Sequence, residues 1–216
     1  WSDHPQPDEY WEKLSPKKYL QDVDLPMLHI GGWFDTHLRG TINLYKAMAA
    51  KSAFPQHIGI GAWAHLPWGR KIGAIDYGPA AESLVDRVQI RWFDQFLKGL
   101  NTGLLEEPPV SLFEMGSNQW RYFESWPSNN QTSYYLASTG LASVRQDEGT
   151  LEPRHEQDII ENLPSKIENS FDVFVHDPWR PVPTLGGHAA IPAGSFDRSG
   201  IDCRTDVLTY TSALLE

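Results

Sequence analysis

Leu25–Asp35 reads LPMLHIGGWFD, and Ile58–His65 reads IGIGAWAH. Each stretch is a short apolar run that ends in small and aromatic residues, followed by one residue that can take part in proton transfer. Continuous apolar runs of this length are typical of strands buried on both faces of a parallel sheet. We therefore predict strands over Leu25–Ile30 and His57–Gly61, each followed by a loop that carries a titratable side chain.

The segments between and after these runs have helical periodicity. Arg39–Lys51 places its apolar residues on one stripe, as an amphipathic helix does. A second helix is predicted to open at Pro79 and to end before Gly99, because proline favours the first turn of a helix and glycine favours the position after the last one. The order strand, helix, strand, loop, helix predicts an α/β fold with a parallel sheet covered by helices.

The character of the chain changes near Glu106–Pro109, which reads EEPP. Downstream, short alternating or aromatic runs are separated by Gly, Pro, Asn and Ser, and Arg145–Gln157 reads as a solvated loop. The runs are Val110–Met115, Gln131–Leu136, Phe171–Val175 and Val207–Thr211. This spacing is typical of an antiparallel β-sandwich or a jelly roll. We predict two domains, residues 1–105 as an α/β domain and residues 106–216 as the β-sandwich or jelly roll.

Charge and composition limit the classes of partner. The formal net charge is -10, which argues against nucleic acid and anionic membranes because both require clustered Lys and Arg. No apolar run is long enough for a membrane span, and the opening residues have neither the basic start nor the apolar centre of a signal peptide. Cys203 is the single cysteine, so no intrachain disulfide can form. We expect a cytoplasmic protein, provided that the parent polypeptide adds no leader.

Asp35 and His65 each follow a predicted strand, where the loops of an open α/β sheet carry working residues. An aspartate that precedes a histidine fits the order nucleophile, acid, base of α/β-hydrolases. A serine hydroxyl needs a neutral imidazole to take its proton, and the imidazole needs a carboxylate to orient it. Spacing alone equally fits Asp35 as a turn or helix-capping residue and His65 as a loop residue.

Several longer motifs resemble one family in order along the chain. They are GGWFD at 31–35, GAWAH at 61–65, RWFDQFLKG at 91–99, PPVSLFEMGSNQWRYFESWP at 108–127, HDPWRPVPTLGG at 176–187 and RTDVLTYTSALL at 204–215. Together they resemble the CocE/NonD hydrolases, which include cocaine esterases and α-amino acid ester hydrolases and are similar to X-Pro dipeptidyl-peptidases. The resemblance implies a serine hydrolase that cleaves ester or amide bonds through an acyl-enzyme.

The resemblance assigns the family's triad acid to Asp35 and its triad base to His65. Ala62 stands where the family's histidine motif has a proline, a change that removes no reacting group. The family's nucleophile lies in a G-x-S motif upstream of the acid, and no serine of this chain has a glycine two places before it. The resemblance therefore implies the C-terminal part of a larger hydrolase, with a remnant of the cap at its start and a partial jelly roll at its end. We expect it to be inactive without the half that holds the serine and the oxyanion hole.

Substrate-binding residues follow from the same resemblance. It places Trp33, Phe34 and Trp63 around the acyl pocket, although aromatic side chains at such positions also fill cores. His37 follows Asp35 by two residues and could face the same pocket or solvent. The loop that ends at Ile191 is expected near the mouth of the site.

Other sites and partners are less well supported by the sequence. The histidines have no HExxH or His-x-His spacing, and glycines 31 and 32 lack a G-x-G-x-x-G pattern, so we expect neither a metal nor a cofactor. The expected partners are a small ester or peptide substrate, the missing N-terminal half, and a second copy paired at an exposed sheet edge. The alternative function is a jelly-roll module that binds carbohydrate or protein through Trp120, Trp126 and Trp179.

Overall fold

The computed structural model describes residues 2–66, 68–128, 132–154, 171–188 and 191–214. Two compact units divide the chain: one comprises Trp1–Lys71 and Asp76–Trp126, and the other Ile72–Ile75 and Pro127–Glu216. Each unit is treated separately below. Within the described ranges, no helix combines the length and the apolar character needed to cross a bilayer.

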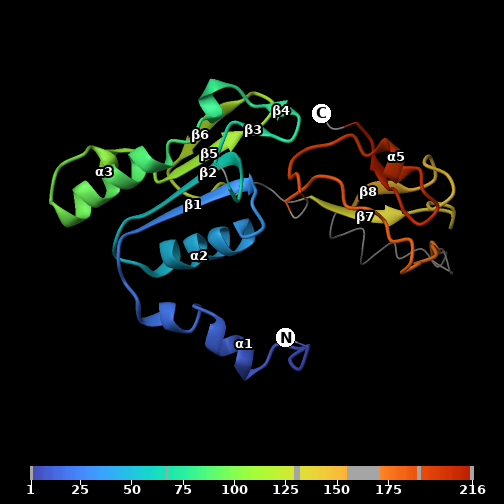
Figure 1. The fold of residues 1–216 in the computed structure, drawn as a ribbon, viewed down its shortest axis with the longest axis horizontal. Helices are drawn as coiled ribbons and strands as arrows, with labels where there is room; N and C mark the ends of the chain where they lie inside the picture. The colour runs from blue at the N-terminus through green and yellow to red at the C-terminus, as the bar shows by residue number, and fades with distance from the viewer. Residues whose placement is uncertain (1, 67, 129–131, 155–170, 189–190, 215–216) are drawn as a thin grey trace. The chain divides into compact units, whose positions relative to one another are not determined.

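The first unit is built on a sheet with the strand order β1-β2-β5-β6 (Figure 1). The strands are β1 (Met27–Phe34), β2 (Gln56–Ala64), β5 (Val110–Glu114) and β6 (Gln119–Phe123). β1 and β2 are parallel, β2 and β5 are parallel, and β5 and β6 form an antiparallel hairpin. The two predicted parallel strands are confirmed, and β1 runs four residues and β2 three residues further toward the carboxyl end than the apolar pattern alone indicated.

One helix covers each face of this sheet. On one face, α2 (Leu38–Lys51) packs Tyr45 against Ile58, Ile60 and Val110, which form the buried core. Because side chains alternate across a strand, the residues between these positions belong to the opposite face. That face is overlaid by α3 (Val85–Leu97).

Short elements complete the first unit. They are α1 (Glu9–Leu14), η1 (Tyr19–Asp22), η2 (Pro79–Ala81) and η3 (Leu104–Glu106). The short strands β3 (Lys71–Ile72) and β4 (Ile75–Asp76) pair with each other, and the division between the units falls within them, with Ile72–Ile75 in the second unit. The helix predicted from Pro79 is two elements: a single 3-10 turn at Pro79 and, after a break, the longer α3. Gly99 has a φ of 67°, as a glycine that ends a helix usually does.

The boundary between the units differs from the predicted one. It falls after Trp126, whereas the Pro-rich stretch at 106–109 suggested a division after residue 105. The reason is long-range pairing: Val110 and Phe113 of β5 are fully buried because β5 lies beside β2. The 106–109 stretch is therefore a connection inside the α/β unit, and the segment predicted as the first jelly-roll strand extends the sheet.

The second unit contains a sheet of β7 (Ser133–Ala137), β8 (Thr150–Arg154) and β9 (Thr211–Ser212), and the short helix α5 (Ser199–Asp202). Part of the stretch predicted as a solvated loop is thus strand β8, and residues 155–157 of it lie outside the described residues. The predicted strand at Phe171–Val175 has no ladder partner among the residues that the structure describes. Instead, Asp172 fixes this segment by accepting hydrogen bonds from Ser138 Oγ and Tyr210 Oη. The described residues establish a β unit, and a complete jelly roll stays a prediction.

Candidate active site

The ends of β1 and β2 place Asp35 and His65 next to each other. Phe34 is the last residue of β1, Ala64 is the last of β2, and these two residues are paired in the ladder. The next residues, Asp35 and His65, leave adjacent parallel strands at the same edge of the sheet. The course of the backbone therefore confirms the prediction that both residues lie just beyond the carboxyl ends of their strands.

An irregularity in the ladder sets this register. Gly32 pairs with Gly61, but Phe34 pairs with Ala64, so β2 has one residue more than β1 between the two pairs. In a regular ladder, Asp35 would lie opposite Ala64. The extra residue is typical of a β-bulge, which re-aims the side chains beyond it. The bulge therefore brings His65 opposite Asp35.

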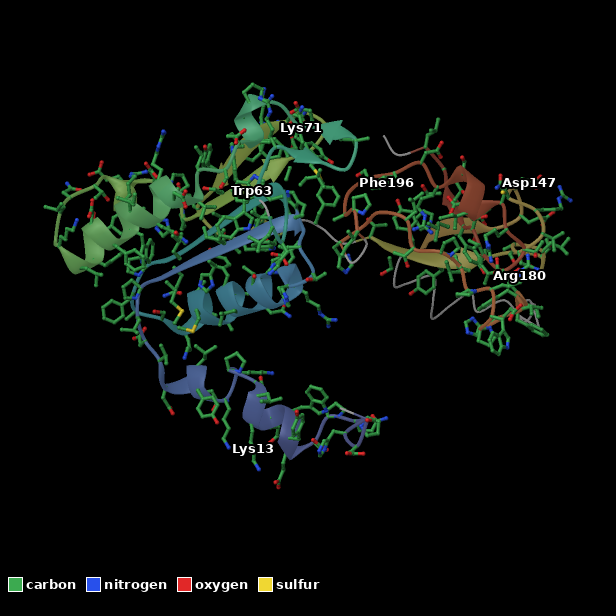
Figure 2. All side chains as sticks on the ribbon, viewed as in Figure 1. Lys13, Trp63, Lys71, Asp147, Arg180 and Phe196 are labelled. Carbon is green, nitrogen blue, oxygen red and sulfur yellow. The ribbon has the colours of Figure 1, made fainter. Side chains whose placement is uncertain are left out.

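Two glycines make room for the bulge. A Cβ atom on Gly32 would lie 2.2 Å from the carbonyl oxygen of Trp63, and one on Gly61 would lie 2.3 Å from the Trp63 ring. Trp63, which is labelled in Figure 2, is buried. Its indole N–H donates to the carbonyl oxygen of Ala81 at 2.7 Å. The sequence analysis did not identify these glycines as site-forming, although glycine two to three residues before each strand end was the available signal.

The contact between Asp35 and His65 favours one tautomer of the neutral imidazole. His65 Nδ1 lies 3.2 Å from both carboxylate oxygens of Asp35. Because an ionised carboxylate only accepts hydrogen bonds, Nδ1 must carry the proton that is shared with it. The Asp35 side chain is 12% exposed and the His65 side chain is 59% exposed, so the acid is enclosed and the imidazole reaches solvent.

His37 contributes to the same cluster in two ways. Its backbone N–H donates to Asp35 Oδ1 at 2.7 Å, which fixes the carboxylate. Its ring lies edge-on to the His65 ring, with centroids 5.0 Å apart and an interplanar angle of 63°. Of the predicted substrate-binding residues, His37 is therefore the one whose ring the structure brings into contact with His65.

The predicted wall aromatics are tied into the interior. Trp33 donates its indole N–H to the carbonyl oxygen of Phe113, and Phe34 packs against the ring of Tyr77. Trp63 is held by Ala81, as described above. These contacts give each ring a packing role in the described residues, and a role in substrate binding stays a prediction for all three.

Ile191 belongs to the second unit, where its side chain is fully exposed and its peptide bond to Pro192 is cis. Residues 189 and 190 of the predicted mouth loop lie outside the described residues. A contribution of Ile191 to the site therefore also stays a prediction. The described residues gather no group of three His, Cys, Asp or Glu side chains that could hold a metal ion.

Comparisons with known proteins agree with this geometry. The family model for X-Pro dipeptidyl-peptidases of the S15 family matches residues 1–67, a span that contains both Asp35 and His65. Cocaine esterase of a Rhodococcus species is 29% identical over 99% of this chain, and a Mycobacterium bovis protein provisionally named as a serine esterase is 28% identical over 94%. The chain is therefore similar to hydrolases of the CocE/NonD and S15 kind.

A solved structure supports the same assignment. A crystal structure of an aminopeptidase from a marine sediment archaeon matches 70% of the chain, with a TM-score of 0.54 and 26% sequence identity. The resemblance to the CocE/NonD hydrolases that the motifs predicted is thus confirmed, together with a hydrolase-like α/β fold. The chain covers 36% and 30% of the two esterase relatives and 25% of the aminopeptidase, about a third of their length or less.

Proposed function

We propose that Asp35 and His65 are the acid and the base of a serine hydrolase that cleaves ester or amide bonds through an acyl-enzyme. The substrates are acyl or aminoacyl esters or X-Pro peptides, in line with the names of the relatives. The nucleophilic serine and the oxyanion hole come from polypeptide outside these 216 residues. The observation that carries the proposal is the contact of His65 Nδ1 with both oxygens of Asp35 at adjacent strand ends.

The orientation of the imidazole supports a role as base. With Nδ1–H donated to Asp35, Nε2 is unprotonated and is the nitrogen that can accept a proton from a hydroxyl. The exposure of His65 leaves that nitrogen accessible to a group from another segment. The enclosed carboxylate of Asp35 is positioned to stabilise the imidazolium that forms.

The reaction steps follow from these positions. His65 Nε2 takes the serine proton while Oγ bonds to the acyl carbon. The tetrahedral intermediate then expels the leaving group, which takes that proton from Nε2, and an acyl-enzyme remains. Water repeats the sequence: Nε2 removes a proton from it, the oxygen bonds to the acyl carbon, and the serine leaves with the proton. Asp35 stays ionised throughout.

The proposal makes the 216 residues inactive by themselves, because removal of the nucleophile and of the oxyanion donors eliminates most of the rate enhancement of such enzymes. The test compares this chain alone with the same chain combined with the serine-bearing polypeptide, using p-nitrophenyl acetate and an X-Pro p-nitroanilide. The combined form should show a burst of nitrophenol followed by turnover, and the chain alone should show neither. Equal turnover by both would contradict the proposal.

The alternative, a binding module that uses exposed tryptophans, has less support. Trp120 lies in β6 and donates its indole N–H to the carbonyl oxygen of Ala80, and Trp126 lies under the ammonium of Lys46. Both residues thus belong to the α/β unit and not to a jelly roll. Trp179 of the second unit is 92% exposed and is the one tryptophan of the three that remains available as a contact residue.

A further inference from the structure

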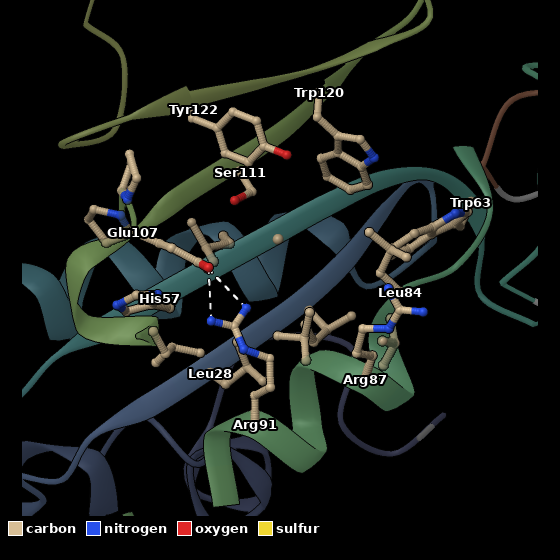
Figure 3. A pocket seen from close by; sticks show the side chains of 18 residues that line it. Leu28, His57, Trp63, Leu84, Arg87, Arg91, Glu107, Ser111, Trp120 and Tyr122 are labelled. Carbon is tan, nitrogen blue, oxygen red and sulfur yellow. Dashed lines mark hydrogen bonds and ion pairs between the residues drawn. The ribbon is translucent and has the colours of Figure 1, made fainter. Parts of the chain in front are cut away.

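A cavity of about 510 Å³ lies between α3 and the face of the sheet opposite to α2 (Figure 3). Its volume falls within the range of about 300 to 1,000 Å³ that is usual for small-molecule sites. Neither Asp35 nor His65 is among its lining residues. The cavity is therefore distinct from the proposed acid-base pair.

The walls of the cavity are mainly apolar. β1, β2, β6 and α3 contribute side chains to them, including Leu28, Ile30, Trp63, Val85, Val88 and Trp120. Gly59 of β2 is part of the floor, and a Cβ atom built on it would meet a single side-chain atom, of Ile30, at 3.8 Å. An apolar group of a ligand can therefore lie directly over the strand at this glycine.

The polar groups of the cavity leave one uncompensated charge. Arg91 is paired with Glu107 through two hydrogen bonds of 2.8 and 3.2 Å. Burial lowers the pKa of His57, an effect that the Glu107 charge partly offsets, so the His57 imidazole is neutral near pH 7. Arg87 has no hydrogen-bond or ion-pair partner among the described residues.

Figure 3 shows how these charges are distributed. The Arg91–Glu107 pair lies beside His57, and Arg87 lies near Leu84 and Trp63. The cavity thus combines an apolar floor with a free guanidinium at one part of its rim. A guanidinium binds carboxylates with two parallel hydrogen bonds, a geometry that an ammonium cannot offer.

We propose that this cavity binds a small amphipathic carboxylate, with its apolar body over Gly59 and its carboxylate on Arg87. The chain's net charge of -10 opposes anions at long range, but salt screens that repulsion beyond about 8 Å at physiological ionic strength. At shorter range, the Arg87 guanidinium favours a ligand with a negative charge. The proposal does not depend on the hydrolase reaction and can be tested on the 216-residue chain.

The test measures binding by isothermal titration calorimetry at pH 7.5 in 150 mM NaCl. Octanoate is the probe, and 1-octanol is the uncharged probe of the same chain length. Octanoate should bind with one-to-one stoichiometry and at least about tenfold more tightly than octanol, because a charge-assisted bidentate contact contributes about that factor. No heat of binding with octanoate, or equal affinity for octanol, would overturn the proposal.

Matched variants locate the ligand. Arg87→Gln should weaken octanoate binding about tenfold and leave octanol unchanged, and Arg87→Lys should recover part of the loss. Gly59→Val should weaken binding of both probes, because the branched side chain would occupy the floor on which the apolar body of the ligand lies. Arg39→Gln, an exposed arginine on α2, is the control and should change nothing. If Gly59→Val reduces thermal stability, the Arg87 variants still test the proposed carboxylate contact. Wild-type affinity for octanoate in Arg87→Gln would refute that contact.

Discussion

A Cβ atom on Gly32 would lie 2.2 Å from the carbonyl oxygen of Trp63, in the bulge that precedes His65. A backbone oxygen cannot move aside as the end of a flexible side chain can. A side chain at position 32, in the strand before Asp35, would therefore displace the backbone at Trp63, in the strand before His65. A residue without a Cβ atom at position 32 is therefore required for the register that places Asp35 beside His65.

Gly32→Ala should destabilise the fold and misalign the pair. Inserting a methyl group into a packed site costs about 1–3 kcal/mol, and here the neighbour is backbone. Urea unfolding measures the loss, and Gly59→Ala is the matched control on the neighbouring strand because its Cβ has space. An alanine at residue 32 with the stability of the control would contradict the role assigned to the bulge.

The buried histidine under α2 makes stability depend on pH. His29 is 6% exposed, contacts Gln56 Oε1 and packs edge-on against Tyr45, and burial lowers its pKa from the usual 6.5. The unfolded state therefore binds more protons than the folded state below pH 6.5. The stability that neutral His29 contributes is present above pH 6.5 and is lost as the pH falls.

Chemical unfolding between pH 5 and pH 8 measures this dependence. His57 shifts in the same direction, so both histidines add to the loss of stability in acid. His29→Gln should flatten the pH dependence, whereas His188→Gln, at an exposed position, should leave it as in the wild type. An unchanged slope in His29→Gln would show that another group titrates.

The free edge of β1 should promote association. β1 is the terminal strand of the described sheet and pairs with β2 alone within it. Unpaired backbone groups along an edge strand attract a further strand. We expect the 216-residue chain to form dimers or larger species in light scattering, and to become monomeric when the serine-bearing polypeptide is added. A monodisperse monomer without that addition would argue against the prediction.

The strand ends and the positions of Asp35 and His65 beyond them were predictable because the signals are local. A continuous apolar run indicates a buried strand, and the residue after it lies at the strand's carboxyl edge. Asp35 and His65 follow from this logic and from the family resemblance. The ring contact of His37 with His65 was not predictable, since a spacing of two residues in a loop leaves the direction of the side chain undefined.

The domain boundary was not predictable from the same signals. The prolines at 106–109 and the alternating run after them indicate a turn and a strand, which is what the structure contains. Which sheet the strand joins depends on the pairing of Val110 with Ile58, about fifty residues away. Local periodicity carries no information on that partner, so β5 was assigned to the wrong unit.

The most direct test of the acid-base assignment is the steady-state kinetics of the complete hydrolase with single substitutions. His65→Ala and Asp35→Asn should each lower kcat by a factor of about 10³ to 10⁴, with small changes in KM, because both residues act in the transition state. His37→Phe is the control that keeps an aromatic ring beside His65 and should retain most of the activity. Full activity in His65→Ala or in Asp35→Asn would contradict the account.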